Sequence, residues 1–183
     1  MTDERPGWVT LATEIVYENP WIRLEEHQVI NPSGGKNLYG KICFKNRAVA
    51  IVALDPRKRV YLVGQQRYTL DAYSWELPMG GAPLSEPPLD AAQRELKEET
   101  GITAARWSEV MRVHTSNSIT DEHGIVYLAQ DLTFGEPEFE ETEDLTIRRV
   151  PADEAVAMAL DGRITDAISV AALLKLQVTG WTS

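Results

Sequence analysis

The sequence predicts an α/β sandwich fold, together with a small antiparallel sheet at the N-terminal end. Short runs rich in β-branched and aromatic residues alternate with turn signals, as expected of strands. One of these runs, residues 48–54, is continuously apolar, which is typical of a strand buried on both faces. Helical patterns occur in the middle of the chain and near its C-terminal end, so the predicted architecture is an α/β/α sandwich.

Length and composition set the class of protein. At 183 residues the chain can form one well-buried domain, and 43% hydrophobic with 25% charged residues excludes a largely disordered body. No apolar run approaches the roughly 18 residues that span a membrane. The N-terminal stretch is polar and acidic, and Cys43 is the only cysteine. We therefore expect a cytoplasmic protein with no membrane partner.

The net charge of the chain limits the classes of molecule that it can bind. The formal net charge is −10. Non-specific affinity for a phosphate backbone comes from basic surface, so we expect no nucleic-acid partner. An anionic small molecule stays compatible with this balance if divalent cations neutralise the acidic groups that face it.

Residues 1–45 are expected to form the N-terminal β segment. Strand-like runs occupy residues 12–18, 21–30 and 38–45. The segment Asn31-Pro32-Ser33-Gly34-Gly35 is a strong turn signal between the second and third runs. These runs predict a small antiparallel sheet.

Residues 46–183 are expected to form the main domain. Further strands are expected at 48–54, 60–68, 75–78, 107–113, 125–132 and 147–150, and helices at 151–160 and 165–178. Two polar loops, 114–124 and 136–144, separate the later strands, and polar connections of such length are more often functional than idle.

Residues 80–102 read as a loop that runs into a short helix. Pro87 and Pro88 suit the first helical turn, where a missing N–H would be unpaired anyway, and Gly101 supplies the stop. The segment around which the chain is organised is therefore a helix with clear start and stop signals.

This helix gathers negative charge. Glu95, Glu98 and Glu99 share one face, because positions i, i+3 and i+4 are neighbours on a helix. Like charges so close repel, so a compensating cation is one interpretation and a solvated acidic face is the other. Oxygen ligands favour Mg²⁺, with Mn²⁺ as an alternative, over Zn²⁺.

The spacing of the segment matches a family motif. Gly80, Glu86 and residues 94–102 fit G-x5-E-x7-R-E-U-x-E-E-x-G-U, where U is a bulky aliphatic residue, and this resembles the Nudix box. Every fixed position matches. Residues 66–68 and 75–80 resemble segments that precede the box in ADP-ribose and nucleoside-diphosphate-sugar pyrophosphatases, and residues 161–167 resemble their last helix junction.

The resemblance implies a Nudix-type α/β/α sandwich over residues 46–183, with a mixed sheet between helices and the box helix on one side. The same resemblance implies a homodimer interface that includes residues 1–45. It also implies metal-dependent hydrolysis of the diphosphate bond of a nucleoside diphosphate sugar, giving a nucleoside monophosphate and a sugar phosphate. The alternatives are hydrolysis of another nucleoside diphosphate derivative or a nucleoside triphosphate, and a nucleotide-binding module without catalysis.

The resemblance also assigns roles within the box. Glu95 and Glu99 are expected to bind the metal together with the main-chain carbonyl of Met79 or Gly80, and Glu98 to hold a further metal or a coordinated water. Arg94 and Glu86 are expected to orient these carboxylates. Gly80 permits the tight backbone path.

The general base is expected outside the box. Related pyrophosphatases often draw it from a later flexible loop, which makes Glu141 and Glu143 the candidates here. Solvation is the alternative explanation for the acidity of this loop.

Four residues are candidate substrate contacts. Arg67 is expected either to bind substrate phosphate or sugar, or to form a structural ion pair. Trp21 and Tyr39 could stack a base, although core packing is the favoured role for both. Asn117 stands where ADP-ribose hydrolases typically have a proline, which puts ADP-ribose in doubt as the preferred sugar nucleotide.

Overall fold

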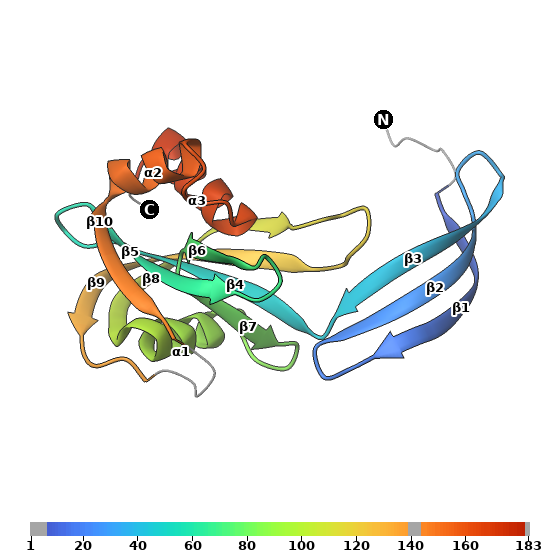
Figure 1. Cartoon of the computed structure of the whole chain (residues 1–183), viewed down its shortest axis with the longest axis horizontal. Helices are drawn as coiled ribbons and strands as arrows, with labels where there is room; N and C mark the ends of the chain where they lie inside the picture. The colour runs from blue at the N-terminus through green and yellow to red at the C-terminus, as the bar shows by residue number, and fades with distance from the viewer. Residues whose placement is uncertain (1–6, 139–143, 182–183) are drawn as a thin grey trace. The chain divides into compact units, whose positions relative to one another are not determined.

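The structure is a computed structural model that describes residues 7–138 and 144–181 (Figure 1). It divides into two compact units, Met1–Asn46 with Ser116–Glu122, and Arg47–Thr115 with His123–Ser183. The segment 116–122 joins the N-terminal unit because Ile42 forms a β-bridge with Thr120 and the amide of Phe44 donates to Asp121. The sequence division at residue 45 did not include this segment.

The N-terminal unit contains an antiparallel sheet in the order β1-β2-β3, formed by Val9–Glu18, Ile22–Ile30 and Lys36–Phe44. The expected turn connects β2 to β3, where Asn31 Oδ1 accepts hydrogen bonds from the amides of Ser33 and Gly35. Pairing then runs without a register shift from Ile30 with Lys36 to Ile22 with Phe44. The predicted N-terminal antiparallel sheet is confirmed.

The main unit holds seven strands within the described residues, in two sheets, and one of them is the expected mixed sheet. A four-stranded sheet has the order β7-β4-β9-β8. In this sheet β4 runs parallel to β9, and β8 runs antiparallel to β9. A three-stranded antiparallel sheet has the order β10-β5-β6. The strands are β4 Asn46–Ala53, β5 Arg59–Arg67, β6 Ala72–Glu76, β7 Met79–Pro83, β8 Ile102–His114, β9 His123–Phe134 and β10 Thr146–Pro151.

Strand β4 is covered by helices on both of its faces. Val49 and Ile51 pack in a core cluster with α1 (Pro88–Thr100), whereas Ala50 and Val52 pack in a cluster with α2 (Ala152–Leu160) and α3 (Ala167–Thr179). Successive side chains of a strand point to opposite faces, so a strand covered on both sides must be apolar throughout. Figure 1 shows α1 on one side of the strands and α2 with α3 on the other, which confirms the sandwich.

The start of the box differs from the expectation. Residues Met79–Pro83 form strand β7 rather than a loop, and β7 pairs at the edge of the four-stranded sheet. The helix begins at Pro88, as the proline signals predicted. No helix in the described part of the chain is long and apolar enough to cross a membrane.

The end of α1 packs tightly against the end of β9. Gly101 ends the helix at φ 69°, and its amide donates to Lys97 O at 2.8 Å. The amide of Gly135 donates to Gly101 O at 2.9 Å, and a Cβ on Gly101 would lie 2.3 Å from Gly135 O. Glycine at position 101 is therefore required both by its backbone angle and by the neighbouring main chain.

We predict that Gly101→Ala lowers the free energy of unfolding by at least about 1 kcal/mol more than Gly162→Ala does, measured by urea denaturation. Gly162 has a similar φ of 83°, and a Cβ on it would have nothing within 4 Å, so its variant measures the cost of the backbone angle alone. Equal losses in the two variants would show that the contact with Gly135 is unimportant.

Candidate functional site

Two glutamates of α1 lie against the start of β7. Glu99 is 2% exposed, and its Oε2 accepts a hydrogen bond from the amide of Met79 at 3.0 Å. A Cβ on Gly80 would lie 2.1 Å from Cδ of Glu95, so no larger residue fits there without moving this carboxylate. The helix spacing and the glycine together bring both carboxylates to the backbone of residues 79–80.

Arg94 connects the remaining acidic groups of the box. Its Nη1 donates to Glu95 Oε1 and to Glu98 Oε2, each at 2.9 Å. Its Nη2 donates to Gly81 O at 3.1 Å and to Glu86 Oε2 at 3.3 Å. Burial lowers the pKa of Arg94, but the hydrogen bond to Glu86 and the charge of Glu95 outweigh burial and raise this pKa above its usual value.

The box thus combines four carboxylates with one guanidinium. Arg94 compensates part of the repulsion that the sequence predicted on this helix face. The surplus of negative charge and the oxygen donors suit a hard divalent cation, and the glycine at position 80 leaves space for a carboxylate beside the main chain. Within residues 7–138 and 144–181, however, no three carboxylate, imidazole or thiol groups are already arranged to hold a metal. The donor chemistry fits a cation, and binding would require these side chains to turn from their present partners.

Arg67, at the end of β5, forms the ion pair that was one of its two predicted roles. Its Nε donates to Glu76 Oε1 at 2.9 Å, its Nη2 donates to Glu76 Oε2, and Glu76 is 3% exposed. The hydrogen bond to Glu76 raises the pKa of Arg67, and the charges of Glu99 and Asp166 add to this effect. The second predicted role of Arg67, binding of substrate phosphate or sugar, stays a prediction.

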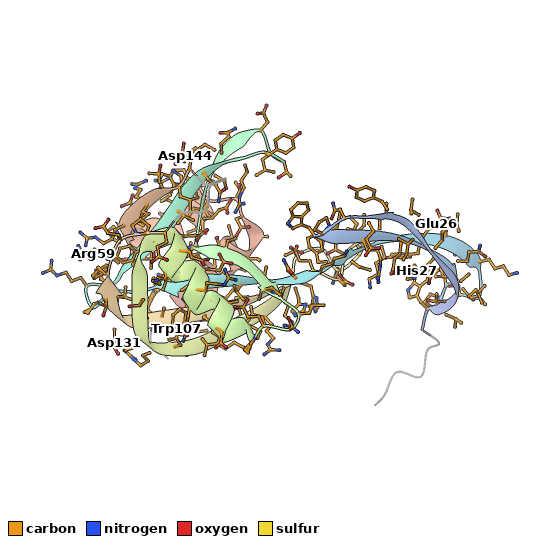
Figure 2. All side chains as sticks on the ribbon, turned by 90° about the horizontal axis from the view of Figure 1, so that it is seen from below. Glu26, His27, Arg59, Trp107, Asp131 and Asp144 are labelled. Atoms are coloured by element: carbon orange, nitrogen blue, oxygen red, sulfur yellow. The ribbon has the colours of Figure 1, made fainter. Side chains whose placement is uncertain are left out.

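The N-terminal unit brings two other predicted residues together. Tyr39 and Asn117 line one cleft of about 300 Å³ with Trp8, His27 and Lys41. The Trp8 and Tyr39 rings meet edge to face at 5.2 Å, and Tyr39 Oη donates to Ser118 O. Figure 2 shows His27 among the side chains of this sheet.

Trp21 is separate from that cleft. It is 66% exposed, so the favoured core-packing role is wrong for this residue.

The expected bases Glu141 and Glu143 lie outside the described residues. Before them, the amide of Glu138 donates to Glu98 O at 2.8 Å, and Lys97 Nζ lies 2.8 Å from Glu138 Oε1. After them, the described chain resumes at Asp144, labelled in Figure 2. Glu138, the last described residue before them, therefore lies at the last turn of α1.

Sequence reasoning missed three polar residues next to Arg67. Ser74, Glu76 and Asp166 line, with Arg67, a cavity of about 540 Å³. Ser74 and Glu76 lie on β6, which pairs with β5, whereas Asp166 precedes α3 far along the chain. Strand alternation could have grouped the first two with Arg67, but no local signal joins Asp166 to them.

Comparison with known proteins identifies related domains and relatives. The NUDIX domain model matches residues 44–173, and the model of the nucleoside diphosphate sugar hydrolase N-terminal domain matches residues 8–42. An ADP-ribose pyrophosphatase of Mycobacterium tuberculosis is 35% identical over 90% of this chain and 81% of that protein. An ADP-ribose pyrophosphatase of Bacillus subtilis is 30% identical over 92% of each chain.

A solved structure shares the fold. The crystal structure of an ADP compounds hydrolase superposes with a TM-score of 0.85, at 23% identity, over 97% of this chain and 98% of that one. Since the NUDIX domain model covers well over half of the residues, this chain belongs to the Nudix family.

Proposed function

We propose that this protein is a divalent-metal-dependent pyrophosphohydrolase that splits the diphosphate bond of a nucleoside diphosphate sugar. The products are a nucleoside monophosphate and a sugar phosphate. The observation that carries the proposal is the set of box carboxylates held by Arg94 beside the start of β7. Two relatives that align over most of the chain are named ADP-ribose pyrophosphatases, which supports this substrate class.

Cleavage of a diphosphate needs neutralised charge, an aligned water and a proton acceptor. A bound Mg²⁺, or Mn²⁺ in its place, would neutralise phosphate charge and lower the pKa of a coordinated water. Glu95, Glu98 and Glu99, with the main-chain carbonyl of Met79, are the proposed ligands. They have the hard oxygen donors that these ions prefer.

The other residues of the site prepare this arrangement. Arg94 fixes the orientation of the carboxylates of Glu86, Glu95 and Glu98 through hydrogen bonds, and these contacts restrict the side chains to the α1 face. Arg67 is proposed to hold a phosphate oxygen with the N–H groups that Glu76 does not occupy. Glu141 and Glu143 remain the proposed bases.

A second substrate class is favoured by one comparison. A hydrolase of Streptomyces rubellomurinus that is 27% identical over 94% of this chain is named for a CMP-linked phosphonate. Together with Asn117, this relative supports a nucleoside derivative other than ADP-ribose as the alternative substrate. Trp21 and Tyr39 are proposed base contacts, and Asn117 a substrate contact, in either case. The cytoplasmic location expected from the sequence stays a prediction.

The N-terminal sheet is proposed to mediate a homodimer. Val9, Leu11, Ile15, Val16 and Tyr17 of β1 are each at least half exposed. Large apolar groups clustered on one exposed strand are typical of an interaction surface. A second copy of the chain is the partner that the family resemblance implies.

We predict that Mg²⁺ or Mn²⁺ raises the melting temperature, because an ion that binds only the folded chain stabilises it by about 2.7 kcal/mol at a hundredfold excess over Kd. Glu99→Gln should lose most of this shift in a thermal melt. The matched control is Glu109→Gln on β8, an exposed carboxylate paired only with Arg112 in the described chain, which should keep the shift. An undiminished shift in Glu99→Gln would contradict the ligand assignment.

We predict that Glu98→Gln lowers kcat for nucleoside diphosphate sugars by about 100-fold or more, with an unchanged circular dichroism spectrum. The amide cannot hold a cation or a proton as the carboxylate does. Activity should be followed by nucleotide release from ADP-ribose, ADP-glucose, UDP-glucose and GDP-mannose, with Glu109→Gln as the control. Turnover at the wild-type rate would rule out the proposed role of Glu98.

We predict that Ile15→Glu weakens the dimer, because a charge in the apolar surface of β1 loses its water on association. Analytical ultracentrifugation should show a rise in the dimer dissociation constant of about tenfold or more. Glu14→Gln on the same strand is the control. A monomeric wild-type protein at all concentrations would refute the dimer.

A further inference from the structure

We propose that His114 and His123 form a binding site for a transition-metal ion of the Zn²⁺ type, separate from the carboxylates of the box. His114 is the last residue of β8, and His123 is the first residue of β9. Both belong to the main unit. The inference does not depend on the proposed function, because neither histidine is part of the box or of the proposed substrate contacts.

The two histidines face each other across the end of a strand pair. Pairing of β8 with β9 continues without a register shift from Met111 to His114, which lies directly opposite His123. Residues opposite each other in an antiparallel pair carry their side chains on the same face of the sheet. The two imidazole rings accordingly meet, with their centres 6.2 Å apart and their planes inclined at 54°.

This separation is close to what a shared ion requires. A zinc ion lies about 2.0–2.1 Å from each histidine nitrogen that binds it, and its ligands are arranged tetrahedrally. One ion held by a nitrogen of each ring would therefore place the ring centres about 5 Å apart. The rings would have to approach each other by only about 1 Å, which small rotations about the side-chain torsions supply.

The main chain beneath the rings is held in place by α3. Val113, next to His114, packs against the core cluster that contains α3, and a Cβ on Gly124 would lie 2.7 Å from Cδ1 of Ile168. Successive side chains of a strand point to opposite faces, so both imidazoles project from the other face of the sheet. A backbone that is already packed lowers the entropy cost of bringing the two ligands to one ion.

Solvent can reach both rings. His114 is exposed and His123 is half-buried, so an ion from solution can bind a nitrogen of each. The net charge of −10 favours the approach of a cation. Because residues 7–138 and 144–181 hold no group of three side chains arranged for a metal, the pair supplies two ligands and water supplies the others.

The type of ligand distinguishes this pair from the box. Imidazole nitrogen suits Zn²⁺, Ni²⁺ and Cu²⁺, whereas carboxylate and carbonyl oxygens suit Mg²⁺ and Mn²⁺. Excess Mg²⁺ therefore competes for the oxygen ligands of the box and not for the imidazoles. The third histidine of the chain, His27, lies in the N-terminal unit with its Nε2 2.8 Å from Glu25 Oε2, and it serves as a control.

The test titrates Zn²⁺ calorimetrically into the full chain in the presence of excess Mg²⁺. His114→Gln and His123→Gln each remove one imidazole, and His27→Gln makes the same change outside the pair. We expect the Kd of Zn²⁺ to rise about tenfold or more in each variant of the pair and to stay unchanged in His27→Gln. Melting temperatures without Zn²⁺ show whether each variant is folded as the wild type is.

Cu²⁺ gives a second readout, because it binds nitrogen ligands more tightly than the other divalent ions of its row. Electron paramagnetic resonance of the wild type with one equivalent of Cu²⁺ should show hyperfine splitting from two nitrogens, and either variant of the pair should lose one of them. A wild-type protein that binds no Zn²⁺ in excess Mg²⁺ would overturn the proposal. So would a folded variant of the pair with the wild-type Kd, an equal loss in His27→Gln, or a Cu²⁺ spectrum with oxygen ligands alone.

Discussion

The contact between Arg94 and three glutamates is the interaction on which the site depends. Helix α1 carries Glu95 and Glu98 less than one turn apart, and like charges at that spacing repel. The guanidinium of Arg94 donates hydrogen bonds to both carboxylates, to Glu86 before the helix, and to the carbonyl of Gly81 on β7. The same side chain thus offsets part of the repulsion and connects the acidic helix to the strand beside it.

A second constraint is the close approach of side chains to the main chain, which is possible only where the main-chain residue is glycine. Gly80 lets the Glu95 carboxylate lie against β7. A Cβ on Gly64 would lie 2.5 Å from Tyr73 Oη and 2.8 Å from the ring of Trp75. At both positions a neighbouring side chain occupies the space that a Cβ would need. In the box, the glycine at position 80 therefore contributes to the position of the Glu95 carboxylate, as the hydrogen bonds of Arg94 do.

The sequence was most informative where the relevant geometry is local. Helical spacing placed Glu95, Glu98 and Glu99 on one face, and start and stop residues located α1 closely. It failed at Met79–Pro83, which reads as a loop because Gly80 and Gly81 are poor strand formers, but which pairs at a sheet edge. Sheet pairing overrode the local preference.

Distant contacts could not be predicted in the same way. The grouping of Arg67 with Ser74 follows from the pairing of β5 with β6, which a register assignment could have suggested. Asp166 reaches the same cavity from a turn much later in the chain. The exposure of Trp21 also depends on what covers a strand turn, and residue type alone does not decide that.

By itself, the sequence determined the α/β class, the extent of the acidic helix, and the family whose motif that helix carries, because each follows from spacing along a few turns or strands. Only the tertiary structure decided that Arg94 joins three glutamates to β7, that the strands divide into two sheets, and that Ser74 and Asp166 border one cavity. These features depend on contacts between segments far apart in the chain, whose distances local preferences do not encode.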